Sequence, residues 1–245
     1  PVTVLTTVVP DPTGYGRVIR QTDGTLLRIA EEKDASEKIR SIREINTGIY
    51  VFDVSYLTEV LSEIKPDNAQ KEFYLTDTVE IAARRGLSVQ GVLGKDPDEF
   101  LGVNSRTDLA AAERAMRHRI NSRHMENGVT LLSPETTFIE ADVVIGQDVV
   151  LYPNTVLQGR TKIGPGATIY PNNRIVDSEL GKEVTLQDGC LIESSRIGDR
   201  SVVGPFAHLR PGSILEKEVR IGNFVELKKC HMGEGSKANH LSYLG

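Results

Sequence analysis

The first hundred residues alternate between strand-like and helix-like patterns of hydrophobic positions. Apolar runs rich in β-branched residues predict strands at Val2–Val9, Thr25–Glu31, Thr47–Asp53 and Leu87–Leu93. Apolar residues three and four positions apart predict helices at Ser55–Ile64 and Thr76–Arg85. Turn residues such as Asp23-Gly24 separate these segments. Such an alternation is typical of an α/β domain.

A longer helix is predicted from Thr107 to about Glu126. Ser105 or Thr107 can cap it, and its apolar positions form one narrow stripe: Leu109, Ala112, Met116 and Ile120. Its basic residues, which could be taken for a nucleic-acid-binding face, are Arg114, Arg117, Arg119 and Arg123. The chain as a whole is acidic, with a net charge of −5, so a solvated connecting helix is the better interpretation.

After about residue 134 the hydrophobic period becomes six. Nineteen positions follow this rule, and 17 of them are Ile, Leu or Val, where ordinary usage would fill about a quarter. They are Ile139, Ile145, Leu151, Leu157, Ile163, Ile169, Ile175, Leu180, Leu186, Ile192, Ile197, Val203, Leu209, Leu215, Ile221, Leu227, Met232, Ala238 and Leu244. A period of six fits neither a helix nor an alternating strand, so it indicates a structural repeat.

The steps shorten to five at three places, and these places test the repeat. The short steps are Ile175 to Leu180, Ile192 to Ile197, and Leu227 to Met232. If three hexads make one triangular coil, all three short steps fall at the same corner. We therefore predict a parallel β-helix in which each coil contacts only its neighbours.

Composition and charge narrow the class of protein. A net charge of −5 argues against nonspecific nucleic-acid binding, and no apolar run approaches 18 residues, so we expect no membrane insertion. Cys190 and Cys230 lie far apart, which indicates neither a disulfide framework nor a zinc site. We expect a soluble, cytoplasmic protein. The chain begins directly with an apolar strand and stops after Leu244 begins a new coil, so we interpret it as an internal piece of a longer protein.

The coil spacing also places polar residues together. Arg210 and Lys228 are 18 residues apart, and Glu226 and Tyr243, like Asn223 and His240, are 17 apart across one short step. Each pair is thus expected to stack on neighbouring coils, about 4.8 Å apart along one edge.

This edge has two interpretations. Two stacked cations without a carboxylate between them would favour a bound anion such as phosphate, and a neighbouring histidine could act as a general base. The alternative is a solvated polar edge without a ligand. Spacing alone leaves both open.

Several motifs in chain order resemble one enzyme family. In the second half these are HLRPG (208–212), IGNFVELKK (221–229) and KANHLSYLG (237–245); in the first half they are GYGRVIR (14–20), EEKDA (31–35), EINTGIYVFD (44–53), NAQKEFYLTD (68–77) and LGVNSR (101–106). They resemble the bifunctional bacterial N-acetylglucosamine-1-phosphate uridylyltransferase/glucosamine-1-phosphate N-acetyltransferases along the whole chain. The resemblance implies part of an α/β nucleotidyltransferase (Rossmann-like) domain at 1–104, a connecting helix at 105–128, and part of a left-handed parallel β-helix of hexapeptide repeats at 129–245.

The resemblance also implies roles for single residues. Gly16, Glu31 and Asn46 would bind UDP-N-acetylglucosamine, and Asn104 would help to hold the nucleotide and Mg²⁺. UTP and acetyl-CoA would be co-substrates.

In the β-helix, the resemblance assigns the acetyl-transfer site. Arg210 and Lys228 would clamp the phosphate of glucosamine 1-phosphate, and Tyr243 would also contact the sugar phosphate. His240 would accept the proton of the amine that attacks acetyl-CoA. The family further implies a homotrimer acting in precursor synthesis for the cell wall and lipopolysaccharide.

The chain departs from the family pattern at two positions. Lys71 and Asn239 stand where the family has glycine, and Asn239 could crowd His240 or occupy a left-handed corner. The glycine-rich nucleotide loop, a metal-binding aspartate and the last coils of the family pattern are also missing. We therefore expect this chain alone to catalyse neither reaction.

Two other functions remain open at this stage. One is a different sugar-nucleotide pyrophosphorylase whose β-helix only regulates or oligomerises, for which His240 would be dispensable. The other is a non-catalytic scaffold of the same two modules, which would not bind UDP-N-acetylglucosamine.

Overall fold

A computed structural model describes residues 1–245. The chain divides into two compact units, Pro1–Ala112 and Glu113–Gly245. Each unit has its own buried apolar core. The two units are therefore described separately.

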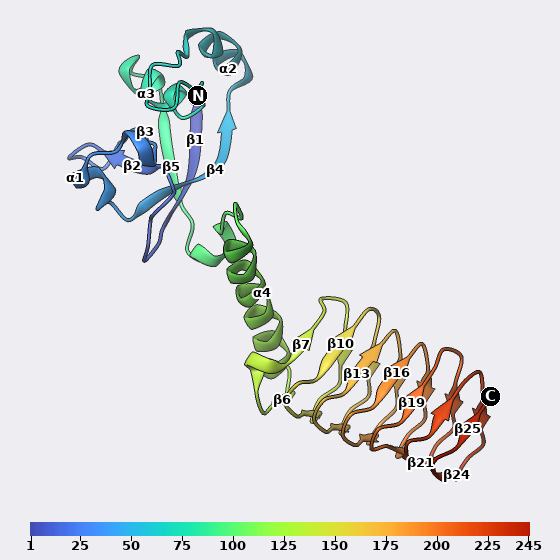
Figure 1. Ribbon diagram of the computed structural model, residues 1–245. Helices are drawn as coiled ribbons and strands as arrows, with labels where there is room; N and C mark the ends of the chain where they lie inside the picture. The colour runs from blue at the N-terminus through green and yellow to red at the C-terminus, as the bar shows by residue number, and fades with distance from the viewer. The chain divides into compact units, whose positions relative to one another are not determined.

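The first unit is built on a mixed five-stranded sheet with the order β3-β2-β4-β1-β5 (Figure 1). Its strands are β1 (Val2–Val8), β2 (Arg17–Arg20), β3 (Leu26–Ala30), β4 (Glu44–Phe52) and β5 (Val89–Leu93). The β1 strand pairs parallel with β5 and antiparallel with β4, and β2 pairs antiparallel with β3. This arrangement directs the segment before β2 and the segment after β3 to the same end of their hairpin.

Short helices cover this sheet. They are α1 (Glu37–Arg40), α2 (Val54–Val60) and α3 (Asp77–Arg84), with 3-10 turns at Glu32–Asp34, Leu61–Glu63 and Pro97–Phe100. Asp53 caps α2, because its Oδ1 accepts a hydrogen bond from the Tyr56 amide at 3.0 Å. Val60, Val79 and Ala82 are fully buried against the sheet residue Val4, so the helices and the sheet share one core.

The sequence predicts most of these elements but misses two. All four predicted strands are present, although β4 starts at Glu44, three residues earlier than expected. The two unexpected elements are β2 and α1, each of four residues. Neither is long enough to show a hydrophobic period, and β2 begins and ends with arginine.

The predicted long helix is α4 (Arg106–Glu126). Ser105 caps it, not Thr107: the Ser105 hydroxyl accepts from the Asp108 amide at 3.1 Å, and the Asp108 carboxylate accepts from the Ser105 amide at 2.8 Å. This reciprocal pair is a capping box with aspartate in place of the usual glutamate. Residues of α4 from Glu113 onward belong to the second unit.

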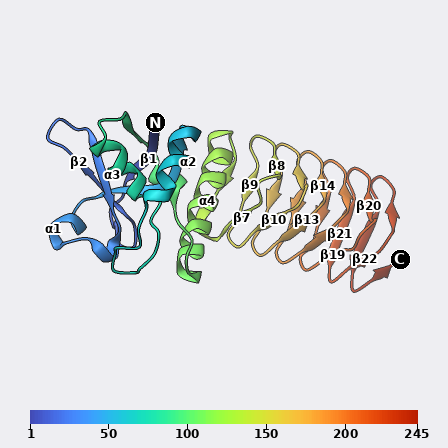
Figure 2. The same ribbon diagram turned by 90° about the horizontal axis from the view of Figure 1, so that it is seen from above.

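The second unit is a parallel β-helix whose successive coils stack along one axis (Figure 2). One sheet contains β6 (Thr130–Leu131), β9 (Val150–Leu151), β12 (Thr168–Ile169), β15 (Thr185–Leu186), β18 (Val202–Val203), β21 (Arg220–Asn223) and β24 (Lys237–His240). A second contains β7 (Phe138–Ile139), β10 (Val156–Gln158), β13 (Arg174–Val176), β16 (Leu191–Glu193), β19 (His208–Leu209), β22 (Glu226–Leu227) and β25 (Tyr243–Leu244). The third contains β8 (Val144–Ile145), β11 (Lys162–Ile163), β14 (Glu179–Leu180), β17 (Arg196–Ile197), β20 (Ile214–Leu215) and β23 (His231–Met232).

The hexad residues form the core of this β-helix, as predicted. Sixteen of the nineteen are buried, and the other three, Ile145, Met232 and Leu244, pack against the core. Each five-residue step connects a strand of the second sheet to a strand of the third, so all three fall at one corner. The predicted fold class, an α/β unit followed by a helix and a parallel β-helix of hexapeptide repeats, is confirmed.

Candidate functional sites

The first candidate site lies in the α/β unit, where three of the predicted residues converge. The Asn46 amide on β4 donates to the Gly16 carbonyl at 2.8 Å. A Cβ atom added at Gly16 would lie 3.0 Å from Cγ2 of Ile29 and 3.3 Å from Oε2 of Glu31. Gly16 therefore brings the backbone close to the Glu31 carboxylate, where a side chain would crowd it.

Glu31 is an unusual carboxylate. Burial raises its pKa; a hydrogen bond from the Thr76 hydroxyl, at 3.1 Å from Oε1, opposes the shift, and the nearby Asp34 and Asp77 add to it. Burial also raises the pKa of the nearby Tyr50 to about 12, so its hydroxyl stays protonated. A partly desolvated carboxylate is well suited to accept hydrogen bonds from ligand hydroxyls.

Asn104 is tied to this region through the backbone. The Tyr15 hydroxyl, next to Gly16, accepts from the Gly102 amide at 3.0 Å, which holds the segment before Asn104 beside the Gly14–Gly16 turn. Asn104 itself is exposed, and its amide donates to Asp108 at 3.1 Å. Sequence reasoning missed Tyr15 and Thr76, although both lie inside the quoted motifs.

The metal expectation has little support from the residues of this chain. Mg²⁺ takes about six oxygen ligands, and Asn104 offers one amide oxygen. No group of three or more His, Cys, Asp or Glu residues could hold a metal ion. These residues therefore do not build a magnesium site by themselves.

Lys71 occupies a conformation that favours glycine. Its φ is 55°, in the left-handed region, within a turn where the Asn68 side chain accepts from the amides of Gln70 and Glu72. The Ala69 amide donates to Asp34 at 2.9 Å, which attaches this turn to the segment that follows Glu31. The left-handed backbone explains why the family pattern has glycine at this position. Lys71 adopts this conformation although it carries a side chain.

The second candidate site lies on the last coils of the β-helix, and the predicted stacking is confirmed. Asn223 pairs with His240, and Glu226 pairs with Tyr243. The Arg210 amide donates to the Leu227 carbonyl at 2.8 Å, which places Arg210 beside Lys228 on the neighbouring coil.

One expectation about this edge is wrong: a carboxylate does contact one of the two cations. Arg210 Nη1 donates to Glu226 Oε1 at 2.9 Å. Glu226 and Lys228 project from the same face of the chain, two residues apart, so Glu226 reaches Arg210 diagonally across the coils. An anion bound here would compete with Glu226 for Arg210.

A second diagonal contact continues this network. His208 Nε2 lies 2.9 Å from Glu193 Oε2, and His208 pairs in register with Glu226. Sequence spacing did not find it, because the partners are 15 residues apart instead of 17 or 18. Acidic side chains from two coils, Glu193 and Glu226, therefore contact His208 and Arg210 on the coil between them.

His240 and its neighbour Asn239 both lie in β24 and are exposed. The suggested left-handed conformation of Asn239 is wrong, because the left-handed residue at this corner is Leu241, with φ 46°. Asn239 matters through its backbone: a Cβ atom at Gly222 would lie 1.6 Å from the Asn239 carbonyl oxygen. Gly222 therefore permits the close approach of β21 and β24 that places Asn223 beside His240.

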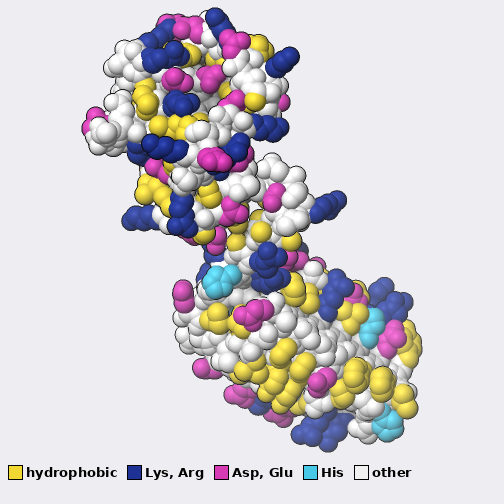
Figure 3. Space-filling model, turned by 60° about the vertical axis from the view of Figure 1, so that its left-hand side comes forward, with side chains coloured by type: hydrophobic (Ala, Val, Ile, Leu, Met, Phe, Trp, Pro, Cys, Tyr) yellow, Lys and Arg dark blue, Asp and Glu magenta, His cyan; other side chains and the backbone are white.

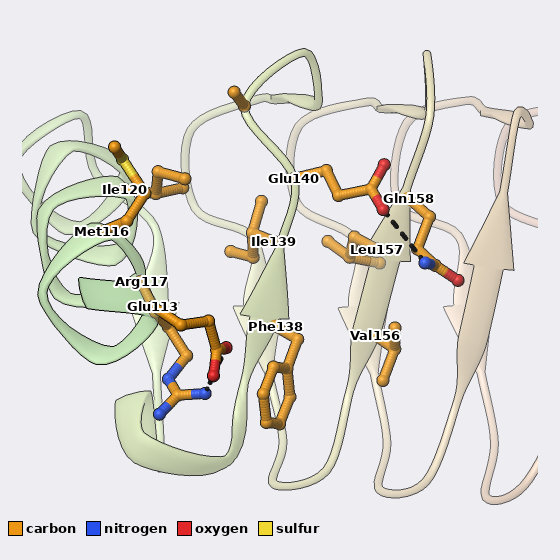
Figure 4. A pocket seen from close by; sticks show the side chains of 11 residues that line it. Glu113, Met116, Arg117, Ile120, Phe138, Ile139, Glu140, Val156, Leu157 and Gln158 are labelled. Atoms are coloured by element: carbon orange, nitrogen blue, oxygen red, sulfur yellow. Dashed lines mark hydrogen bonds and ion pairs between the residues drawn. The ribbon is translucent and has the colours of Figure 1, made fainter. Parts of the chain in front are cut away.

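An apolar pocket of about 640 Å³ lies at the other end of the β-helix unit, between α4 and the strands β7 and β10 (Figure 4). Met116, Ile120, Phe138 and Val156 line it. Arg117 lies 4.5 Å from the centre of the Phe138 ring and pairs with Glu113 at 3.0 Å. No predicted site residue lines this pocket, and hydrophobic side chains also reach the surface of the β-helix elsewhere (Figure 3).

Comparison with protein families gives two matches in the order of the two units. Residues 1–97 match the family described as nucleotidyl transferase. Residues 135–237 match the family described as GMPPB C-terminal domain. The first match contains Gly16, Glu31 and Asn46, and the second contains Arg210 and Lys228.

Curated relatives match both units at once. The chain is 49% identical over 243 residues to the bifunctional protein GlmU of Clostridium beijerinckii. This alignment covers 99% of the chain and 53% of that protein. The chain is 50% identical over 244 residues to the protein of the same name from Caldanaerobacter subterraneus subsp. tengcongensis. That alignment covers 100% of the chain and 53% of the relative. The chain thus spans about half the length of these relatives.

Among solved structures, a GDP-perosamine N-acetyl transferase from Caulobacter crescentus aligns with 64% of this chain and 69% of its own. The identity is 16% and the TM-score is 0.43, which is too low to carry an argument. The sequence identity to the curated relatives is the stronger finding, since it extends through the α/β unit, α4 and the β-helix. Along its whole length the chain is similar to the bifunctional GlmU proteins.

Proposed function

We propose that this chain carries residues of two transferase sites. In one reaction, glucosamine 1-phosphate is acetylated by acetyl-CoA. In the other, UMP passes from UTP to N-acetylglucosamine 1-phosphate, which gives UDP-N-acetylglucosamine and pyrophosphate for the synthesis of cell-wall and lipopolysaccharide precursors. The pairing of a nucleotidyl transferase unit with a β-helix in one chain supports this combination.

The acetyl-transfer proposal assigns a role to each residue of the last coils. Arg210 and Lys228 bind the phosphate of the amino sugar, and Tyr243 donates a hydrogen bond to it. The amine attacks the thioester carbonyl, so that a C–N bond forms and the C–S bond breaks. His240 accepts the proton that the amine loses.

The register between coils is the observation that supports this assignment most. Asn223 and Glu226 on one coil pair with His240 and Tyr243 on the next. This register brings a candidate base and a candidate phosphate site to the same edge. The Arg210–Glu226 ion pair is half-exposed, so a phosphate can reach the guanidinium and replace the carboxylate.

The uridylyl-transfer proposal uses the cluster in the first unit. Glu31 accepts hydrogen bonds from sugar hydroxyls of UDP-N-acetylglucosamine, and Asn46 and the exposed backbone at Gly16 complete the contact. Asn104 contacts the nucleotide. Mg²⁺ would neutralise the phosphate charge when it is bound, but no step is assigned to it, because Asn104 is the one ligand that this chain offers.

The similarity to GlmU proteins also supports a homotrimer, which is part of this proposal.

The chain contains no helix with the length and apolar character that a membrane span requires.

Titration calorimetry with two ligands tests both sites at once. The chain should bind glucosamine 1-phosphate and UDP-N-acetylglucosamine separately. An Arg210→Ala/Lys228→Ala double variant should lose the first ligand and keep the second, and Gly16→Ala should do the reverse. Each variant is thus the folding control for the other.

The result also separates the two competing functions. A scaffold would bind neither ligand. A pyrophosphorylase with a purely structural β-helix would bind UDP-N-acetylglucosamine alone, and His240→Ala would then leave acetyl transfer unchanged in any active form of the protein.

A further inference from the structure

One corner of the β-helix changes its residue type along the axis. This corner joins the first sheet to the second, and its residue is left-handed in successive coils. The residues and their φ angles are Asn154 (61°), Asn172 (63°), Gly189 (69°), Phe206 (54°), Phe224 (55°) and Leu241 (46°).

The first three residues suit this backbone and the last three do not. Glycine and asparagine tolerate the left-handed region, whereas bulky side chains there are strained. Burial of these side chains does not offset the backbone strain, because Phe206, Phe224 and Leu241 are 52%, 55% and 76% exposed. Neither backbone preference nor core packing explains why three large apolar side chains occupy these positions.

The three side chains occupy the same corner of three successive coils, and we call them the apolar ridge (Phe206, Phe224 and Leu241). The rings of Phe206 and Phe224 stack with their centroids 5.4 Å apart and an interplanar angle of 8°. A Cβ atom at Gly189 would lie 2.6 Å from the Phe206 ring, so the preceding glycine leaves room for the stack.

The ridge lies in the middle of the candidate acetyl-transfer site. On one side of it, Asn223 pairs with His240. On the other side, Glu226 pairs with Tyr243, followed by Lys228. Phe224 and Leu241 lie between these pairs in the chain, at the left-handed corner where the first sheet passes into the second, so the ridge borders both pairs.

We propose that Phe224 and Leu241 are positioning residues for the acceptor, a phosphorylated amino sugar whose carbon skeleton packs on the ridge. This inference rests on the proposed acetyl transfer. A pyranose ring has an apolar C–H face, and an aromatic surface beneath it provides contact area without competing for its hydroxyls. An apolar surface beside the amine also disfavours its charged form, and the neutral amine is the nucleophile.

Replacing a ridge residue by asparagine separates this role from a structural one. Phe224→Asn should relieve the backbone strain and raise the melting temperature of the β-helix by about 2–4 °C. The same change should weaken glucosamine 1-phosphate binding about tenfold, through loss of apolar contact. Affinity for inorganic phosphate, which cannot reach across the ridge, should stay unchanged.

A matched control lies at another corner. Glu183 is also left-handed, with φ 55°, so Glu183→Asn should raise the melting temperature without changing either affinity. Leu241→Asn provides a second ridge variant beside His240, and should behave as Phe224→Asn does.

Opposite changes in stability and in sugar-phosphate affinity would support the inference. Undiminished glucosamine 1-phosphate binding by both ridge variants would overturn it, while the proposed function would stand. A smaller particle mass in light scattering, with a parallel loss of affinity, would also overturn it, because the ridge would then be a subunit contact. No binding by the unmodified chain would overturn the proposed function and this inference with it.

Discussion

Glu31 is a single residue whose burial makes the stability of the first unit depend on pH. It is partly buried next to Gly16, with Thr76 donating to it and two acidic residues nearby. Its pKa is raised mainly by burial, so the folded protein holds this proton more tightly than the unfolded chain does. Stability therefore falls as the pH rises from the ordinary value of the carboxyl through its raised value.

We predict that Glu31→Gln raises the melting temperature of the first unit at pH 8. Glutamine keeps an oxygen that accepts from Thr76 and carries no charge to desolvate. The gain should shrink as the pH is lowered through the raised pKa and should vanish below 4.5, the ordinary pKa of glutamate, where the wild-type carboxyl becomes protonated in both states. Calorimetric scans across this range measure it, and a lower melting temperature at pH 8 would contradict the account.

At the scale of single residues, the candidate sites were only partly predictable from sequence. The stacked pairs Asn223–His240 and Glu226–Tyr243 follow from the coil length, because a fixed period fixes the register. The diagonal pairs Arg210–Glu226 and His208–Glu193 do not follow, since they depend on where long side chains point. Residue spacing in the sequence predicts which backbone positions stack on neighbouring coils. It does not predict which side chains then contact one another.

At the scale of elements, the strength of the hydrophobic pattern decides what the sequence can predict. The β-helix strands have only two to four residues each, yet they were found because their period repeats over many coils. The strand β2 has four residues and belongs to no repeating pattern, so the sequence does not predict it. Propensity alone is too weak to identify so short a strand.

The pairing of β21 with β24 depends on one glycine. A Cβ atom at Gly222 would overlap the Asn239 carbonyl oxygen, so Gly222→Ala must move β24 away. We predict a loss of about 1–3 kcal/mol in the unfolding free energy of the β-helix, together with weaker glucosamine 1-phosphate binding. Denaturant titration and calorimetry measure the two effects.

Gly233→Ala is the matched control for this change. A Cβ atom there would meet only the Ser236 hydroxyl oxygen, at 3.7 Å, and its φ is not in the left-handed region. It should leave both quantities nearly unchanged. Equal effects of the two alanines would show that contact between β21 and Asn239 is not the cause.

At the scale of the whole molecule, the two units have separate cores and should respond separately to core substitutions. Leu186 is fully buried in the middle of the β-helix, and Val4 is fully buried in the sheet of the first unit. Leu186→Ala should cost about 2–5 kcal/mol and lower only the unfolding transition of the β-helix. Val4→Ala should lower only the other transition.

Scanning calorimetry of both variants tests this separation. Because each coil of a solenoid contacts only its neighbours, a cavity at Leu186 also divides the β-helix into two shorter stacks, which broadens its transition. A single transition that shifts equally in both variants would show that the units unfold as one body.

The most direct test concerns the proposed binding of one sugar phosphate by Arg210 and Lys228, which lie one coil apart. A double-mutant cycle of Arg210→Ala and Lys228→Ala, measured by calorimetric titration with glucosamine 1-phosphate, gives their coupling free energy. If both cations hold the same phosphate, the coupling should exceed about 0.5 kcal/mol. Strictly additive losses, or unchanged affinity in either single variant, would contradict the assignment of this edge as the sugar-phosphate site.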